Sequence, residues 1–210
     1  MINKKLLIHG LNNSLNSKNY YNDWAESYEK TLDKWNYQAP YMSAKILLKF
    51  ANPLPTKILD LACGTGLFAE SIKDKLFKST MEGADISVKS IKIAKKKKIY
   101  NKFYQFDFQK KFNFPVNNYD CVSCIGSMTY CENPSSLFSG IKDILKNNGY
   151  FLFTHRNDLW KKQKFTSLIT STSHLWKKIY LSKPIDYLPK NKDFGEKIKI
   201  KICLLKKIKE

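Results

Sequence analysis

The sequence contains no apolar run that approaches the roughly 18 residues needed for a membrane-spanning helix. The apolar stretch near its start, Leu6 to Ile8, is too short for the core of a signal peptide. We therefore expect a cytoplasmic protein that has no membrane partner. The 210 residues, 43% of them hydrophobic, are enough to build one domain with a self-sufficient core.

Cysteine is scarce and has no regular spacing, since the chain holds five in irregular positions. The nearest pair, Cys121 and Cys124, lies in an apolar run that reads as a strand. Residues three apart in a strand point to opposite faces, so these two thiols cannot share a metal ion. We predict buried, reduced thiols and no metal site.

Arginine is nearly absent, because Arg156 is the only one among the 37 basic residues. The formal net charge of +19 suggests nucleic acid or a membrane surface as a partner. Phosphate recognition, however, often uses the planar fork of arginine, and the lysines are spread along the chain apart from one run over 95–98. A compositional bias toward lysine explains the charge better. Nucleic acid stays open as a less favoured partner, and the oligomeric state is open too.

Hydrophobic patterning divides the chain into four parts. Residues 1–19, rich in Asn, Ser and Lys, are predicted to form a flexible arm. Residues 20–52 show the spacing of two helices, over 23–34 and 41–50, that could form a lid. Residues 56–156 alternate strands with helices, and residues 157–210 hold a helix and two further strands. The predicted strands cover 57–61, 80–85, 103–106, 119–125, 150–154, 175–181 and 196–207.

Five strands that alternate with helices indicate the α/β class, with a doubly wound sheet and helices on both faces. The run Tyr119 to Ile125 is almost continuously apolar, as expected of a parallel strand covered on both sides. The last strand alternates isoleucine with lysine and is predicted to be half exposed. We therefore predict a seven-stranded, mostly parallel sheet that ends in an antiparallel hairpin.

Small and acidic residues follow three of the predicted strands. The first strand runs into Ala62-Cys63-Gly64-Thr65-Gly66, a glycine turn that lets a ligand approach the backbone closely. Asp85 ends the second strand, where a carboxylate can accept both hydroxyl hydrogens of a ribose. Asp107 follows the third strand and could accept a hydrogen bond from an adenine amino group. Because parallel strands end at one edge of the sheet, all three features should line one crevice.

These motifs resemble class I S-adenosylmethionine-dependent methyltransferases, which have a Rossmann-like sheet. The resemblance covers about residues 20–207 and extends to small members such as the methyltransferase-like proteins of the Williams–Beuren region. It rests on the segments Ile58-Leu59-Asp60-Leu61-Ala62-Cys63-Gly64-Thr65-Gly66, Gly83-Ala84-Asp85-Ile86-Ser87, Gln105-Phe106-Asp107-Phe108, Tyr119-Asp120-Cys121-Val122-Ser123-Cys124-Ile125-Gly126, Leu145-Lys146-Asn147-Asn148-Gly149-Tyr150 and Tyr21-Asn22-Asp23-Trp24-Ala25-Glu26-Ser27-Tyr28. The chain departs from many members at Ala62, where they carry a glycine.

The resemblance implies that S-adenosylmethionine is the cofactor and assigns its binding residues. Asp60 would order the loop and the methionine end of the cofactor, Asp85 would hold the ribose, and Tyr28 would cover the site as a lid or simply pack there. The cofactor-binding set implied is Tyr28, Asp60, Ala62, Gly64, Thr65, Gly66, Asp85, Ile86, Asp107, Phe108, Ile125 and Gly126. The implied reaction is direct methyl transfer from a sulfonium to a nucleophile, and a base is needed only for a protonated acceptor.

The acceptor is less well defined by the sequence. Candidate bases are His155, after the fifth predicted strand, and Tyr130, after the fourth. The chain lacks the D/N/S-P-P-Y/F motif of DNA amino-methyltransferases and any Pro-Cys pair, so a small molecule is our first choice. RNA or protein methylation, and a non-catalytic cofactor-binding scaffold, stay open. An NAD-dependent oxidoreductase would need a third glycine after Gly66, where Phe68-Ala69 stand.

Overall fold

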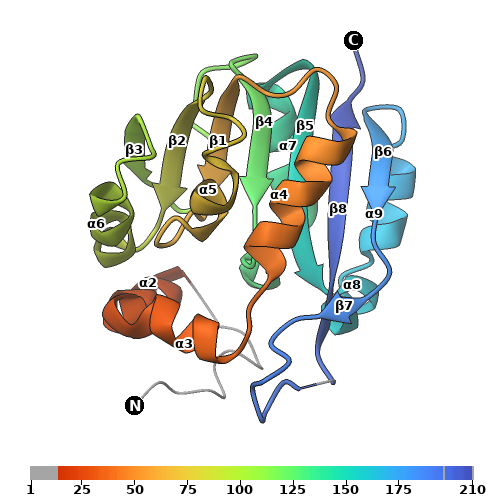
Figure 1. The fold of residues 1–210 in the computed structure, drawn as a ribbon. Helices are drawn as coiled ribbons and strands as arrows, with labels where there is room; N and C mark the ends of the chain where they lie inside the picture. Colours follow the sequence, from red (N-terminus) through yellow and green to blue (C-terminus); the bar gives the residue numbers. More distant parts are fainter. Residues whose placement is uncertain (1–13, 196, 210) are drawn as a thin grey trace.

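The computed structural model describes residues 14–195 and 197–209. It confirms the predicted α/β class, with a mixed sheet in the order β3-β2-β1-β4-β5-β8-β6 and a short strand, β7, paired to β8 (Figure 1). Strands β1 to β5 are parallel, and β8 runs antiparallel to β5, β6 and β7. The strands are β1 Lys57–Leu61, β2 Thr80–Asp85, β3 Lys102–Gln105, β4 Tyr119–Cys124, β5 Leu145–Arg156, β6 Trp176–Leu181, β7 Ile185–Asp186 and β8 Lys199–Lys207.

The predicted terminal hairpin corresponds to β6 and β8, which pair antiparallel as expected. Strand β8 is inserted between β5 and β6, and β7 adds one strand to the predicted seven. The helices are α2 Ser14–Trp24, η1 Ala25–Ser27, α3 Tyr28–Lys34, α4 Ala39–Phe50, α5 Leu67–Ile72, α6 Val88–Lys96, η2 Met128–Tyr130, α7 Pro134–Ile144, α8 Asn157–Lys162 and α9 Phe165–Ser171.

Two helical boundaries differ from the sequence prediction. Helix α2 begins at Ser14, so residues 14–19 of the predicted arm are helical, and residues 1–13 lie outside the described residues. Packing of the aromatic residues on α2 stabilises this helix where polar composition argued against it. The single helix predicted within residues 157–210 is divided into α8 and α9 at Lys164, which has a left-handed backbone with φ 54°.

Two hydrophobic layers cover the sheet, one on each face. Leu47 of α4 and Phe68 of α5 pack on one face, and Phe138 of α7 and Phe165 of α9 pack on the other. Successive strand residues point into different layers, as the two-residue period of a strand requires. Ile58 belongs to the layer under α4 and α5, and Leu59 belongs to the layer under α7 and α9.

Cys121 and Cys124 belong to opposite layers, as predicted from their spacing. Cys121 packs with the α4–α5 layer and Cys124 with the α7–α9 layer. Both thiols are free and buried. Each therefore acts as a small apolar side chain in its own part of the core.

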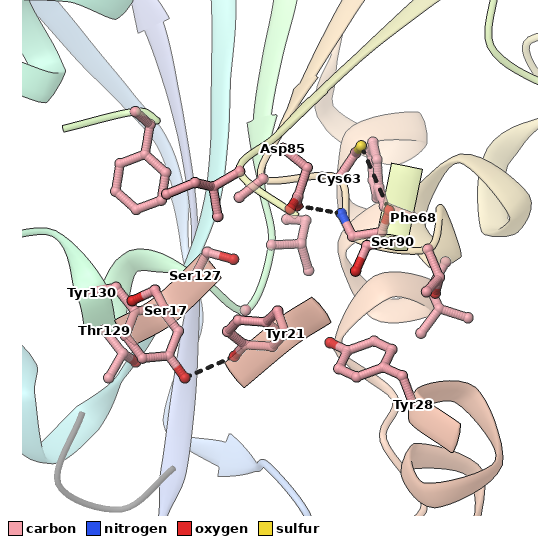
Figure 2. Close-up of a pocket in the computed structure, with 18 of the residues that line it drawn as sticks. Ser17, Tyr21, Tyr28, Cys63, Phe68, Asp85, Ser90, Ser127, Thr129 and Tyr130 are labelled. Atoms are coloured by element: carbon pink, nitrogen blue, oxygen red, sulfur yellow. Dashed lines mark hydrogen bonds between the residues drawn. The ribbon is translucent and has the colours of Figure 1, made fainter. Parts of the chain in front are cut away.

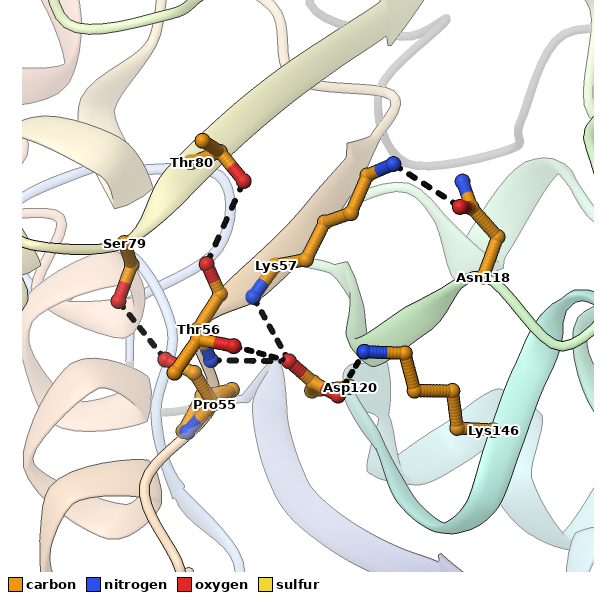
Figure 3. A network of polar contacts seen from close by, with 8 residues as sticks. All are labelled: Pro55, Thr56, Lys57, Ser79, Thr80, Asn118, Asp120 and Lys146. Atoms are coloured by element: carbon orange, nitrogen blue, oxygen red, sulfur yellow. Dashed lines mark hydrogen bonds and ion pairs between the residues drawn. The ribbon is translucent and has the colours of Figure 1, made fainter.

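A polar network joins the strands at the edge where β1 begins (Figure 3). The Asp120 carboxylate accepts hydrogen bonds from the Thr56 N–H and hydroxyl and from the Lys57 N–H, at 2.7–3.0 Å, and pairs with Lys146 Nζ at 2.7 Å. Partial burial would raise the pKa of Asp120, but these donors hold it below its usual value. The network ties β1, β4 and β5 together at the amino end of β1. The opposite ends of the parallel strands, their carboxyl ends, are left for a ligand.

A third hydrophobic cluster lies beyond that opposite edge. It joins the N-terminal helices to the segment before β8 through Trp24, Leu32, Leu188 and Phe194. Figure 1 shows α2 and α3 next to the ends of the parallel strands marked by the arrowheads. The helices therefore cover the carboxyl edge of the sheet, where ligands bind in open α/β sheets.

Candidate functional site

A cavity lies at the carboxyl edge of the parallel strands and extends under α2 and α3. Its wall includes all of the predicted cofactor-binding residues except Gly66: Tyr28, Asp60, Ala62, Gly64, Thr65, Asp85, Ile86, Asp107, Phe108, Ile125 and Gly126. Gly66 instead forms the N-cap of α5. The structure thus brings together the turn after β1 and the ends of β2, β3 and β4.

The turn after β1 has a left-handed backbone at several positions. Ala62 has φ 56°, and Gly66 has φ 92°. A Cβ atom at Gly66 would lie 3.1 Å from the Tyr100 ring, so glycine is favoured there by both conformation and space. The turn is anchored to β2, because Cys63 N–H donates to the Ala84 carbonyl at 3.0 Å.

Asp85, at the end of β2, is the centre of the hydrogen bonds in this turn. Its Oδ2 accepts from Gly64 N–H at 2.7 Å (Figure 2), and its Oδ1 also accepts from Ser87 N–H at 2.8 Å. Burial raises the pKa of Asp85 to about 6, although the backbone donors of Ser87 and Gly64 oppose the rise. An ionised carboxylate offers about four acceptor sites, so lone pairs remain available for ligand hydroxyls.

Asp60, at the carboxyl end of β1, is buried beside Asp85. Tyr100 donates its hydroxyl hydrogen to Asp60 Oδ2 at 2.6 Å, and Ser123 of β4 donates to Oδ1 at 2.8 Å. Burial raises the pKa of Asp60 to about 6, the two hydroxyl donors lower it, and the charge of Asp85 raises it further. Sequence reasoning missed both partners. Ser123 could have been suspected as a polar residue within an apolar strand, whereas Tyr100 carried no signal.

Asp107 lies two residues past the end of β3, among partly buried aromatic residues. Its Oδ1 accepts a hydrogen bond from Gln109 N–H at 3.0 Å, which orients the carboxylate at the cavity wall. Phe108 lines the wall beside it, and so does Phe106, which was not predicted. The arrangement places an acceptor next to apolar ring surfaces, which suits a flat heterocycle that carries a hydrogen-bond donor.

Tyrosine side chains form another part of the cavity wall. Tyr21 and Tyr130 share a hydrogen bond of 2.7 Å between their hydroxyls (Figure 2). Tyr28, Tyr37 and Tyr187 complete this wall. Burial raises the pKa of Tyr187 to about 12 and that of the other four well above the usual value, so all remain protonated.

The two predicted candidate bases have different positions. Tyr130 lines the cavity, but its raised pKa makes it a hydrogen-bond donor rather than a base near neutral pH. His155 does not line the cavity: it is buried, with its ring centroid 4.4 Å from that of Phe165, and burial lowers its pKa to about 4. Successive residues of a strand point to opposite faces, so Arg156 is the residue of β5 that reaches the cavity.

The described residues contain no group of three or more potential metal ligands. Among the same residues, no helix is both long and apolar enough to cross a membrane. The charged side chains among the described residues that line the cavity are those of Asp60, Asp85, Asp107 and Arg156.

The strand order is that of a Rossmann-like α/β domain, and the cavity lies at the carboxyl ends of its parallel strands. Residues 34–182 match the methyltransferase domain family, and the chain belongs to that family. This confirms the prediction of a class I S-adenosylmethionine-dependent methyltransferase at the level of family and fold.

Individual relatives share only part of their sequence with this chain. Malonyl-[acyl-carrier protein] O-methyltransferase 2 of Ilyobacter polytropus is 33% identical over 46% of this chain and 38% of its own length. Methyltransferase-like protein 27 of Homo sapiens is 24% identical over 71% of this chain and 62% of its own length. The matched region therefore spans less than two thirds of either relative. The solved structure of the plantazolicin methyltransferase BpumL in complex with SAH and a pentazolic desmethylPZN analog has the same fold, with a TM-score of 0.64 and 17% identity, covering 92% of this chain and 91% of that one.

Proposed function

We propose that this protein is an S-adenosylmethionine-dependent methyltransferase that transfers a methyl group by direct displacement to a small-molecule acceptor. The observation that carries the proposal is the convergence of Asp60, Asp85 and Asp107, from three successive strands, on one cavity beside a glycine turn. Membership of the methyltransferase domain family supports it, and so does the fold shared with a methyltransferase solved with SAH.

The residues of the cavity suit S-adenosylmethionine. Asp85 keeps lone pairs for ribose hydroxyls while the backbone holds it in place, and Asp107 with Phe108 suits the adenine edge and face. The buried hydroxyl of Thr65 lines the cavity and has no hydrogen-bond partner among the described residues, which makes it suited to a polar ligand group. Asp60 and Asp85 also give this end of the cavity a negative charge, which favours a cationic ligand.

The protein contributes alignment and exclusion of water. When bound, the cofactor supplies a methyl group on a positively charged sulfur, which is reactive without further activation. Trp24 and Tyr28, with ring centroids 4.7 Å apart, cover the cavity from the N-terminal helices, and Tyr187 covers it from the C-terminal segment. Such a closed aromatic wall holds two reactants together and keeps water from the reacting atoms.

The covered cavity is also the reason for preferring a small acceptor over RNA or protein. Helices α2 and α3 pack against the segment that contains Leu188 and Phe194, so these elements cover the cavity on the side away from the sheet. A folded RNA or protein would need this wall to open, whereas a small molecule is enclosed by it.

Transfer of labelled methyl groups to a size-fractionated cell extract tests the proposal. Label in low-molecular-mass products supports it. Label in RNA or protein instead would support a macromolecular acceptor. Binding of S-adenosylhomocysteine without transfer to any fraction would favour the cofactor-binding scaffold and overturn the catalytic assignment.

A further inference from the structure

We infer that Tyr100 is a positioning residue of this site: from outside the cavity, its hydroxyl keeps Asp60 in the ionised form that holds a cationic group of the cofactor. The inference rests on the proposed function, because it concerns the ligand of the same cavity. Three features carry it: the contacts of the Tyr100 ring, the surroundings of the Asp60 carboxylate, and the charge of S-adenosylmethionine.

Tyr100 reaches Asp60 from the hydrophobic layer that α4 and α5 form on one face of the sheet. Its ring packs against that layer, and the ring centroid lies 4.8 Å from that of Phe103. A Cβ atom at Gly66 would lie 3.1 Å from the ring, so the glycine turn also contacts it closely. The hydroxyl donates to Asp60 Oδ2 at 2.6 Å. Asp60 lines the cavity and Tyr100 does not, so Tyr100 acts on a ligand only through Asp60.

The carboxylate of Asp60 is buried without a basic partner. Among the described residues, no ion pair includes Asp60 or Asp85. The other titratable groups around Asp60 are the Asp85 carboxylate at the end of β2 and the thiols of Cys63, Cys121 and Cys124. Burial raises the pKa of all three thiols, so they stay neutral. No cation therefore stabilises the negative charge of Asp60.

Two hydroxyl groups stabilise that charge instead. Burial raises the pKa of Asp60 to about 6, the hydrogen bonds from Tyr100 and Ser123 lower it, and the charge of Asp85 raises it. Each hydroxyl donates to the carboxylate, so it favours the ionised form over the protonated one. Loss of the Tyr100 bond should move the ionisation of Asp60 about one to two pH units upward, to neutral pH or beyond.

The charge of Asp60 matters because the proposed cofactor is cationic at this end. S-adenosylmethionine carries one positive charge on sulfur and another on its amino group near neutral pH. An ionised carboxylate attracts such a group, whereas a protonated carboxyl group has no charge and presents a donor hydrogen. Asp85 accepts its hydrogen bonds from backbone N–H groups, which every residue supplies. The charge of Asp60 depends instead on two particular side chains, Tyr100 and Ser123.

The pH dependence of ligand binding by the Tyr100→Phe variant tests the inference. Phenylalanine keeps the ring that packs against Gly66 and Phe103 and removes only the hydroxyl. Calorimetric titration uses S-adenosylhomocysteine, which keeps the amino group, between about pH 5.5 and pH 8.5. We expect the fall in affinity at low pH to begin about one to two pH units higher in the variant. The variant should bind at least about threefold more weakly than the wild type near pH 6.5 and within about twofold near pH 8.5.

Two further variants complete the experiment. Tyr119→Phe is the matched control, because it removes a hydroxyl that donates to Glu82 Oε2, also at 2.6 Å, and neither residue lines the cavity. It should keep the pH profile of the wild type. Ser123→Ala removes the second donor to Asp60 and should shift the profile in the same direction as Tyr100→Phe.

Four results would overturn the inference. The first is an unchanged profile in Tyr100→Phe, and the second is a loss of affinity by the same factor at every pH, which a change in packing alone would cause. The third is an equal shift in Tyr119→Phe, and the fourth is an unshifted profile in Ser123→Ala. Failure of the wild-type protein to bind S-adenosylhomocysteine at any pH would instead count against the proposed function itself.

Discussion

Asp85→Asn is the substitution that separates ligand binding from folding most clearly. The carboxylate of Asp85 is buried, and it accepts two backbone hydrogen bonds, from Gly64 and Ser87. Asparagine has nearly the same shape but only one acceptor oxygen, and its amide group is a donor. The variant therefore keeps the packing of the site and removes acceptors that the ribose hydroxyls would use.

The expected loss of affinity follows from the hydrogen bonds involved. Hydrogen bonds to a charged group contribute about 1.5–3 kcal/mol each, and the amide can replace neither ribose bond in full. A total loss of about 3 kcal/mol corresponds to roughly a hundredfold weaker binding of S-adenosylhomocysteine.

The free energy of unfolding should change much less than the affinity. The rise in the pKa of Asp85 from 3.8 to about 6 means that the buried charge costs the folded state roughly 3 kcal/mol above that pH. Asparagine removes this cost and leaves one backbone N–H without its acceptor, which costs about 1–3 kcal/mol. The two effects offset each other, so the melting temperature of the ligand-free variant should stay close to that of the wild type.

Calorimetry and thermal unfolding of the same samples measure both quantities. Glu82→Gln is the matched control: Glu82 lies on the same strand, accepts hydrogen bonds from Tyr104 and Tyr119 at 3.0 and 2.6 Å, and does not line the cavity. It should bind S-adenosylhomocysteine within about twofold of the wild type. If Asp85→Asn also binds within about threefold, Asp85 does not hold the ribose and the reasoning is refuted.

Three further predictions concern pH, space and a buried charge. Affinity for S-adenosylhomocysteine should fall as the pH drops below about 6, because Asp60 and Asp85, both with a pKa of about 6, gain protons. The free energy of unfolding should rise as the pH falls through the same range, because the native state binds more protons there than the unfolded chain does. Titrations of the ligand and denaturant curves between about pH 4 and pH 8 measure the two effects. Gly126→Ala should weaken binding by at least about tenfold and lower the melting temperature, because its φ is 83° and a Cβ would lie 2.5 Å from the Tyr37 hydroxyl; a variant that binds normally would exclude this close contact. Lys207→Met should lower the free energy of unfolding by about 2–4 kcal/mol in urea without changing affinity, because the buried ammonium donates hydrogen bonds to three oxygens far from the cavity; an unchanged urea midpoint would contradict it.

Local rules were sufficient to predict that the glycine turn and Asp85 lie together in one cavity. The glycine turn and Asp85 follow predicted strands directly, and parallel strands place their carboxyl ends at one edge of the sheet. Knowing the strand limits within a residue or two was therefore enough to gather these residues in one cavity.

The residues at the end of β5 could not be predicted in the same way. Strand β5 continues to Arg156, past the predicted end at residue 154, and the choice between His155 and Arg156 depends on which face each residue takes. The bond from Tyr100 to Asp60 joins residues that are distant in sequence and carry no shared pattern. The start of α2 at Ser14 depends on packing against the C-terminal segment, which only the folded chain shows.

Calorimetric titration of the purified protein with S-adenosylmethionine and S-adenosylhomocysteine tests most directly whether this cavity is a methyl-donor site. We predict that each ligand binds to one site per chain with micromolar affinity and that the two ligands compete. Absence of binding by either ligand to protein that is folded by circular dichroism and unfolds cooperatively would contradict the assignment of this cavity.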